Sequence, residues 1–246
     1  MGHRFLVDTN LPIDTEDPEV AAVLERFDVT VEGSTDLPLI GRRIAAHEPD
    51  IAFIPSADLH RIVRRGDRHY RGLAIPTSKF TGTVDYPSVM VVRRDDPADS
   101  LLDLRGASCG YINRSCTSSY FPPALLLNER GIRFDAFLDM RPVPAWQGQI
   151  DAVVSGAVRL TSVPEDVWRT EPGNADTTRI IGRYEPARPA VVVARHDLDR
   201  ELRAALVEAL CGWLPPWRSI YGCFKPYLDA DLHHMFHELD ALPADA

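Results

Sequence analysis

LRGASCGYINRSCTSSYFPPALLLNERG, residues 104–131, is the stretch that decides the fold of this chain. Residues 108–112 form a short run suited to a buried strand, and residues 120–130 are apolar with a helical period. Gly131 follows the periodic segment, and glycine is a common residue just after the last turn of a helix. The stretch therefore predicts a strand, a loop and then a helix.

Hydroxyl side chains crowd the loop of this stretch. Four of them lie within five positions: Ser115, Thr117, Ser118 and Ser119. A helix that begins among hydroxyls brings side-chain donors, free backbone N–H groups and the positive end of its dipole to one place. One hydroxyl alone would be an ordinary helix cap with the others solvated. Four together favour a site for phosphate, phosphonate or carboxylate.

The composition is that of a globular protein, with 246 residues of which 45% are hydrophobic and 26% charged. This length suits one large domain or two small ones. A net charge of −9 argues against nucleic acid as a partner, because phosphate tracks need a basic surface. No apolar run is long enough to span a membrane. The first residues enter a strand without a secretory signal, which predicts a cytoplasmic protein, or an extracytoplasmic one if the sequence is a trimmed mature form.

Cys116 is the cysteine that stands out among the four of the chain, because it lies inside the hydroxyl loop. A thiol beside a helix N-terminus is more nucleophilic than an ordinary one. The alternative is that Cys116 replaces a serine of similar size, and this is favoured because no His is adjacent in the sequence to activate it. The sequence contains no C-x-x-C motif, and we predict no cofactor.

Strands and helices alternate in the first part of the chain. Strands are predicted at residues 4–8, 29–32 and 50–54, and helices begin near Asp17 and Leu37. This order implies a parallel sheet with helices on both faces, and the apolar third strand suits a sheet that is covered on both sides. Asn10 and Ser56 follow the first and third strands, where loops line ligand crevices. Both are candidate ligand contacts, although Ser56 is also a candidate helix cap.

The later elements extend the first lobe and indicate a second α/β lobe. Strands are predicted at residues 70–76, 88–93, 134–140, 151–158, 179–184 and 190–195, and helices at 146–150, 198–213 and 231–242. Crossings near residues 94 and 187 divide the chain into lobe 1, residues 1–93 plus 188–246, and lobe 2, residues 94–187. We expect a hinged ligand cleft between the lobes, with the hydroxyl loop facing Asn10, Ser56 and residues 80–86.

Several stretches resemble the phosphate-, phosphite- and phosphonate-binding proteins of ABC transporters. They are residues 86–97, 100–106, 115–127, 191–203 and 229–232. The resemblance implies the two-lobe type II periplasmic-binding-protein fold, an α/β fold with mixed, mostly parallel sheets. It also implies that Thr117 and Ser118, with the N–H groups of Ser118 and Ser119, bind a small oxyanion. An ABC permease would be the partner if the chain is exported.

Two departures from the family pattern concern the ligand. Cys116 occupies the place of the loop's first serine and is a weaker donor. Ser155, with Gly156 and Ala157, occupies a place where the family often has an acidic residue that can meet a substrate amine, which disfavours an aminoalkylphosphonate. Tyr86 and Tyr120 are candidate contacts for an organic group beyond the anion. Together with Ser115, these residues complete the predicted ligand-binding set.

An enzyme on the same fold is the alternative prediction, because fold does not settle function. It would act on a small organic acid or a phosphorylated metabolite, with Cys116, His60 and Asp58 as nucleophile and acid–base groups. His233 and His237 are spaced as a zinc-binding pair on the last predicted helix. They lack the intervening Glu of zinc-enzyme helices, so we predict solvated histidines and no metal.

Overall fold

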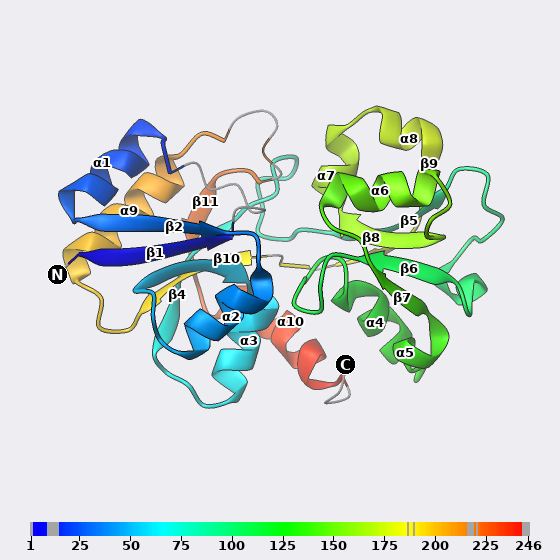
Figure 1. Cartoon of the computed structure of the whole chain (residues 1–246), viewed down its shortest axis with the longest axis horizontal. Coiled ribbons are helices and arrows are strands. Elements are labelled where there is room, and N and C mark those ends of the chain that lie inside the picture. The colour runs from blue at the N-terminus through cyan, green and yellow to red at the C-terminus, as the bar shows by residue number, and fades with distance from the viewer. Residues whose placement is uncertain are drawn as a thin grey trace. The chain divides into compact units, whose positions relative to one another are not determined.

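The computed structural model describes residues 2–8, 15–185, 187–188, 190–215, 219 and 221–242 (Figure 1). The chain forms two compact units. Unit 1 consists of Met1–Val84 and Ala190–Leu232, and unit 2 of Asp85–Pro189 and His233–Ala246. Each unit is built around one sheet that is flanked by helices, so the α/β class predicted from the sequence is confirmed.

The described part of unit 1 contains a sheet with the strand order β11-β4-β10-β3-β1-β2. The strands are β1 His3–Asp8, β2 Val29–Ser34, β3 Ile51–Pro55, β4 Tyr70–Pro76, β10 Ala190–Arg195 and β11 Phe224–Pro226. β1 pairs in parallel with β2 and β3, whereas β10 runs antiparallel between β3 and β4. Every residue of β3 is buried, as predicted for a strand covered on both faces.

The helices that lie wholly within the described part of unit 1 are α1 Pro18–Arg26, α2 Leu37–Ala45, α3 Ser56–Arg64 and α9 Arg200–Gly212, and all but α3 begin at acidic caps. Asp17, Asp36 and Asp199 each accept hydrogen bonds from N–H groups in the first turn of α1, α2 and α9. α3 differs, because its cap position is Pro55 and no side chain caps it. Ser56 is therefore the first residue of α3 and not its cap.

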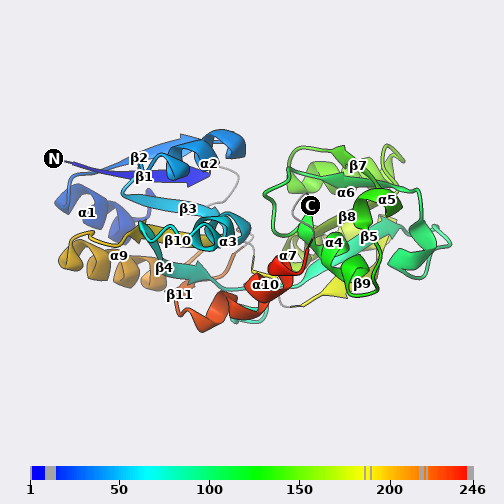
Figure 2. The ribbon, with the colours of Figure 1, turned by 90° about the horizontal axis from the view of Figure 1, so that it is seen from below.

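Unit 2 holds a sheet whose described strands follow the order β7-β6-β8-β5-β9. They are β5 Ser88–Arg93, β6 Ser108–Tyr111, β7 Asp139–Pro142, β8 Leu160–Pro164 and β9 Thr178–Tyr184. β6 pairs in parallel with β7 and β8, and β5 runs antiparallel between β8 and β9. In Figure 1 the helices α4 Phe121–Asn128 and α5 Phe134–Phe137 lie apart from α6 Trp146–Val154, α7 Glu165–Thr170 and α8 Gly173–Thr177, with the sheet between the two groups, and Figure 2 views unit 2 from the side of α4 and α5.

Two strands predicted in this part of the chain are wrong. Residues 134–140 form α5 and the start of β7, and residues 151–158 are the end of α6, up to Val154, and the turn that follows it. Ile150 and Val153, three residues apart, are buried on the same side of α6, and Gly156 follows the helix at φ 79°. A short apolar run such as residues 151–158 fits a buried strand and a buried helix equally well, so the prediction of a strand here was not specific. The true strand, β8, comes after it.

β5 lies in unit 2, although the sequence prediction placed residues 88–93 in the first lobe. Its Val89 and Val91 are fully buried, and the strand separates β8 from β9. The C-terminal helix α10, Ala230–Asp240, also reaches unit 2, to which His233 and the residues after it belong. There the buried Tyr184 hydroxyl donates to the Glu238 carboxylate. None of the helices in the described residues is long and apolar enough to cross a membrane.

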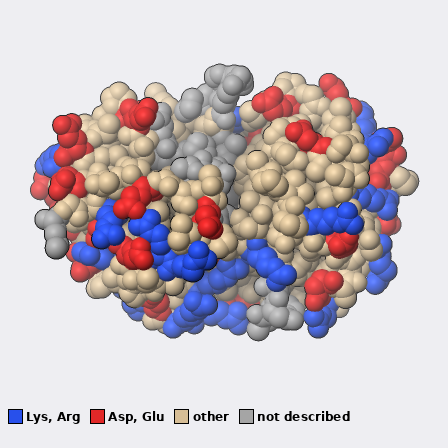
Figure 3. Space-filling view, in the orientation of Figure 1, with Lys and Arg blue, Asp and Glu red and all other residues tan. Residues whose placement is uncertain are grey.

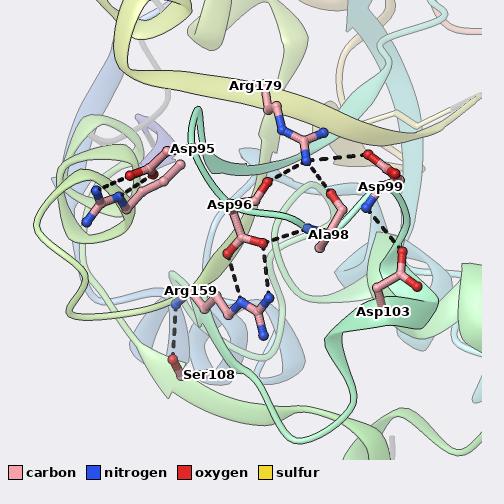
Figure 4. A network of polar contacts seen from close by, with 9 residues as sticks. Asp95, Asp96, Ala98, Asp99, Asp103, Ser108, Arg159 and Arg179 are labelled. Atoms are coloured by element: carbon pink, nitrogen blue, oxygen red, sulfur yellow. Dashed lines mark hydrogen bonds and ion pairs between the residues drawn. The ribbon is translucent and has the colours of Figure 1, made fainter.

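A polar network fastens the segment between β5 and β6 to the starts of β8 and β9 (Figure 4). Arg159 donates to both carboxylate oxygens of Asp96, at 2.8 and 3.0 Å. Arg179 donates to the carbonyls of Asp96 and Ala98, both at 2.6 Å. The hydrogen bond from Arg159 is the main reason why the pKa of Asp96 lies below its usual value. This segment is therefore held in place by charge-assisted hydrogen bonds.

Basic side chains gather over α2 and α3 on the face shown in Figure 3, but acidic partners accompany them. Arg43 of α2 bonds to Glu32 and Glu48, and Arg61 of α3 bonds to Asp58 at 2.7 Å. Arg43 and Arg61 on this face are therefore paired with carboxylates.

Candidate anion site

One edge of the unit 2 sheet collects the beginnings of α4, α6 and α7. These helices follow β6, β7 and β8, which run in parallel, so the carboxyl ends of the strands meet at this edge. β5 runs the other way, and its first residue, Ser88, is paired with Pro164 at the end of β8. Ligands of open α/β sheets bind outside the carboxyl ends of the strands. The candidate site of unit 2 lies here.

The hydroxyl loop between β6 and α4 is held by its own backbone. The N–H of Cys116 donates to the Asn113 carbonyl and the N–H of Tyr120 to the Cys116 carbonyl, both at 3.1 Å. The N–H of Ile112 donates to Ser119 Oγ, also at 3.1 Å. α4 begins at Phe121, so the hydroxyls precede the helix and do not occupy its first turn. No side chain caps the helix at Tyr120.

Ser118 is the centre of this loop. Its side chain is fully buried, as is that of Ser119, and Thr117 is 3% exposed. Ser162 Oγ of β8 donates to the Ser118 carbonyl at 2.8 Å. Within the described residues, however, Ser118 Oγ has no hydrogen-bond partner, and the N–H groups of Ser118 and Ser119 have no acceptor. Buried polar groups are normally paired, so these three donors indicate a binding site for an acceptor.

The beginning of α6 adds donors that the sequence analysis missed. Trp146 Nε1 and Gln149 Nε2 are buried without a partner among the described residues. Gln149 is fully buried, and its Oε1 accepts from the Thr161 hydroxyl, so its amide N–H₂ is the part of the side chain that has no partner among the described residues. Ala145, just before the helix, has φ 62° and ψ 151°, a conformation that residues other than Gly rarely adopt. Nothing in the sequence marks a Trp and a Gln on a helix as donors, because their lack of partners depends on distant packing.

The two predicted aromatic contacts are both buried in unit 2. Tyr86 has no exposed surface, and its N–H donates to the Ala187 carbonyl at 2.9 Å. The ring of Tyr120 stands edge-on to those of Tyr111, Phe121 and Phe134, with centroids 5.3 to 5.4 Å apart. Tyr120 is therefore part of an aromatic cluster, whose packing accounts for its position. Ser88, which the prediction did not single out, has a buried hydroxyl without a partner in the described chain.

Ser155, the predicted counterpart of an acidic residue, lies after α6, whereas the buried acids that follow β8 are Glu165 and Asp166. Ser155 follows the last turn of α6, is exposed, and donates to the Ala152 carbonyl at 3.3 Å. Glu165 directly follows β8 and is buried. Arg169 donates to one of its carboxylate oxygens at 2.7 Å, and Arg183 donates to the other. The acid is thus already neutralised by two arginines.

The remaining predicted residues lie elsewhere. Asn10 lies outside the described residues, and the N–H of Ser115 donates to Asn113 Oδ1. Ser56, at the start of α3 in unit 1, is fully buried, and its hydroxyl lacks a partner in the described chain. The proposed acid–base residues also lie in unit 1, where His60 is buried and Asp58 pairs with Arg61. Their proposed nucleophile, Cys116, belongs to unit 2.

The predicted zinc pair lies on the surface of α10. His233 and His237 are both exposed. Across the residues that the structure describes, no group of three or more His, Cys, Asp or Glu side chains is placed to hold a metal ion.

A sequence model of the family described as "ABC transporter, phosphonate, periplasmic substrate-binding protein" matches residues 20–214. The chain belongs to this family. No curated protein matches this binding protein. A Xanthomonas citri protein solved with chloride has a similar fold, with a TM-score of 0.75 and 17% identity, and the match covers 97% of this chain and 96% of that one.

Two further solved structures carry the family's name or ligand in their descriptions. The binding-protein component of an ABC phosphonate transporter from Pseudomonas aeruginosa has a TM-score of 0.72 and 16% identity, over 96% of this chain and 85% of its own. PhnD1 from Prochlorococcus marinus, in complex with methylphosphonate, has a TM-score of 0.73 and 13% identity, over 98% of both chains. At such identities the structures establish the fold, which is the predicted two-lobe periplasmic-binding-protein fold.

Family membership confirms the predicted function class. The chain is a solute-binding protein of the phosphonate type, and the family description implies a small-molecule ligand and an ABC permease as partner. The family is periplasmic. The comparisons give no support to the alternative of a biosynthetic enzyme on the same fold.

Proposed function

We propose that this binding protein holds a phosphorus oxyanion, phosphate or a small phosphonate, in front of α4. The observation that carries the proposal is the buried, unpartnered hydroxyl of Ser118, which lies beside the N–H groups of Ser118 and Ser119. Thr117, the neighbouring buried hydroxyl, completes this side of the ligand. The donors are neutral, so the attraction for an anion comes from hydrogen bonds and from the dipole of the helix.

The donors at the start of α6 extend the same site. Trp146 Nε1 and Gln149 Nε2 are N–H groups only, so each requires an acceptor atom on the ligand. A phosphonate group presents three oxygens and phosphate four, enough to engage donors of both helices. At Glu165 neither carboxylate oxygen is open to a ligand amine, since Arg169 and Arg183 occupy both. The donor set therefore suits an oxyanion whose organic part is small and carries no amine.

One solved precedent supports this ligand class. PhnD1 from Prochlorococcus marinus is described in complex with methylphosphonate, and its fold matches that of this chain along nearly the whole length. The proposal for this chain nevertheless depends on its own donors, because the two sequences are only 13% identical.

Calorimetric titration and thermal unfolding of the purified chain test the proposal. The panel contains phosphate, phosphite, methylphosphonate, sulfate, methanesulfonate and acetate. A ligand present at 100 times its dissociation constant adds about 2.7 kcal/mol to the free energy of unfolding. We expect a phosphorus oxyanion to give this stabilisation and to be recovered unaltered.

A double variant, Thr117→Ala with Ser118→Ala, locates the site. It should lose the stabilisation by phosphorus oxyanions, whereas the control Ser155→Ala, which changes an exposed serine, should retain it. Stabilisation by acetate alone would contradict the phosphorus ligand. Unchanged affinity in the double variant would contradict the placement of the anion in front of α4.

A further inference from the structure

Two histidines of unit 1 stack face to face, although they belong to different turns. His47 lies in the turn after α2, and His69 lies in the segment between α3 and β4. Their ring centroids are 3.9 Å apart and their planes differ by 8°. Tyr70, the first residue of β4, stands edge-on to both rings, with centroids 6.0 Å from His47 and 4.7 Å from His69. We name the pair His47 and His69 the histidine stack.

Asp67 joins the two turns on one side of the histidine stack. One of its carboxylate oxygens accepts from Nε2 of His47, and the other accepts from the backbone N–H of His69, both at 2.8 Å. A carboxylate only accepts, so Nε2 of His47 carries the proton of this bond. His47 has φ 57°, a left-handed conformation that few residues other than glycine adopt. The stack and the Asp67 bonds therefore hold the turn after α2 against the start of β4.

His69 lacks a partner at one ring nitrogen. Its Nε2 atom is buried and has no hydrogen-bond partner among the described residues. A neutral ring can carry its proton on Nδ1, which leaves Nε2 without a hydrogen to donate. A protonated ring carries an N–H at both nitrogens, so its Nε2–H would be buried without an acceptor. Burying such a charged donor is costly, and the structure therefore suits the neutral form of His69.

The end of β10 closes the other side of the histidine stack. The N–H of His196 donates to the His69 carbonyl at 2.7 Å, and the rings of His69 and His196 stand edge-on with centroids 6.1 Å apart. Arg195, the last residue of β10, pairs with Asp50 at 2.9 Å and with Asp197 at 2.8 Å. His69 thus also anchors the end of β10 through its main chain.

Charges of both signs face His69 from every segment around it. They belong to His47 and Asp67 in the two turns, Tyr70 of β4, and Arg195, His196 and Asp197 at the end of β10. Burial, followed by the ring of His47, lowers the pKa of His69, and Arg195 adds to this effect. Asp67 and Asp197 act in the opposite direction but do not outweigh the burial. The surroundings therefore agree with the unpartnered Nε2 in favouring a neutral ring.

We propose that the histidine stack is an acid-sensitive latch of unit 1, closed while His69 is neutral and opened when His69 takes up a proton. The charged ring must leave its buried place for water, because its Nε2–H has no acceptor there and the face of His47 lies against it. Leaving separates the turn after α2 from the start of β4, and it loosens the end of β10, which is bonded to the His69 carbonyl. The latch belongs to unit 1, whereas the proposed anion site belongs to unit 2, so the two proposals are independent.

The sign of the pH dependence follows from the lowered pKa of His69. The folded state binds this proton less tightly than the unfolded state, in which the pKa of histidine is about 6.5. The stabilisation by the latch is therefore complete above about pH 6.5. It is lost as the pH falls through the lower pKa of the folded state.

Two NMR measurements on the purified full chain test the latch. A titration of the histidine rings should give His69 a pKa below about 6.5. Hydrogen exchange of the main-chain N–H groups of His69 and His196 reports the opening. After correction for the intrinsic exchange rate, their opening equilibrium should rise at least about fivefold between about pH 7.5 and about pH 5.

The variant His69→Phe keeps a flat ring for the stack but has no group to protonate. Its opening equilibrium should change by less than about twofold over the same pH range. His69→Gln, which is smaller and also does not titrate there, should show the same loss of acid response if the Phe ring does not fit. The matched control, His233→Phe on α10, removes an exposed histidine of unit 2 and should keep the response of the wild type.

Three results would overturn the proposal. A pKa of His69 at or above about 6.5 in the folded protein would show that the folded structure accepts the proton. An acid response that both variants of His69 retain would assign the opening to other groups. An opening equilibrium of the wild type that does not change with pH would show that the stack stays closed in acid.

Discussion

Ser162 on β8 donates a 2.8 Å hydrogen bond to the carbonyl of Ser118 in the hydroxyl loop, and both side chains are fully buried. The C=O and N–H groups of one trans peptide point in opposite directions. Fixing the Ser118 carbonyl toward β8 therefore turns the N–H of Ser119 away from the sheet, where it has no acceptor among the described residues. The hydrogen bond from Ser162, on the side of the sheet, thus fixes the direction of one donor of the proposed anion site, the Ser119 N–H.

Replacing Ser162 by alanine should lower both stability and affinity. The Ser118 carbonyl would remain buried without its donor, which costs about 1–3 kcal/mol of unfolding free energy. Affinity for the phosphorus oxyanion should also decrease, because the Ser119 N–H loses its fixed direction. Urea unfolding and calorimetric titration measure the two effects. A stable variant with reduced affinity would agree with the orienting role, whereas reduced stability with unchanged affinity would contradict it; Ser155→Ala should stay within about 0.5 kcal/mol of the wild type.

An amine on the ligand should bring no gain in affinity. Both carboxylate oxygens of Glu165 are engaged, one by Arg169 and the other by Arg183. We therefore expect 2-aminoethylphosphonate to bind no more tightly than ethylphosphonate. Removing one partner with Arg183→Ala should shift the ratio of the two dissociation constants toward the amine ligand. A wild-type preference for the amine would show that another acid receives it.

Acid should weaken the network shown in Figure 4 through Asp96. The hydrogen bond from Arg159 holds the pKa of Asp96 below its usual value. The folded state therefore binds the proton less tightly than the unfolded state, whose carboxyl pKa is about 3.9. The stabilisation is complete above that pH and is lost as the pH falls through the lower pKa of the folded state.

Arg159→Gln tests this linkage. At neutral pH the variant should be less stable by about 1 kcal/mol, a value kept small because the guanidinium is partly exposed. The difference should disappear in acid, as measured by urea unfolding from pH 7 downward. Arg141→Gln breaks the exposed pair with Asp139 and should cost less. A difference between Arg159→Gln and the wild type that persists at the lowest pH would exclude the Asp96 carboxylate as its cause.

Gly72 of β4 lies directly under the ring of Tyr227. A Cβ added at Gly72 would be 2.2 Å from the nearest ring atom, so Gly72→Ala should cost about 1–3 kcal/mol by overpacking. Trimming the ring with Tyr227→Ala should recover part of that loss in the double variant. Gly41→Ala on α2 has free space and should raise stability by about 0.5–1 kcal/mol. If the double variant lost the full sum of the two single losses in unfolding free energy, the clash between the Cβ at position 72 and the Tyr227 ring would be contradicted.

Local pattern predicted the hydroxyl loop and several elements well. The strand at residues 190–195 and the one at 70–76 have the predicted bounds, because β-branched and apolar runs bounded by polar turns are specific for strands. Strand pairing depends on residues that are far apart in the sequence, so residues 88–93 alone do not indicate which sheet the strand joins. β5 was accordingly placed in the wrong lobe.

The candidate site was only partly predictable for a related reason. Hydroxyls at Thr117, Ser118 and Ser119 are visible as a cluster in the sequence. The donors of Trp146 and Gln149 are not, because their lack of partners arises from the packing of α6 on β8. The predicted strand at residues 151–158 also led to Ser155 as a candidate contact, although Ser155 follows α6, and the prediction missed the buried Glu165 after β8.

Two donors of the proposed site, the N–H groups of Ser118 and Ser119, belong to the main chain. Only proline lacks a main-chain N–H, so substitution of either residue by any other amino acid leaves the donors in place. A substitution at Ser118 therefore removes its hydroxyl but leaves these two donors in place, so the side-chain and main-chain contributions to anion binding can be changed separately.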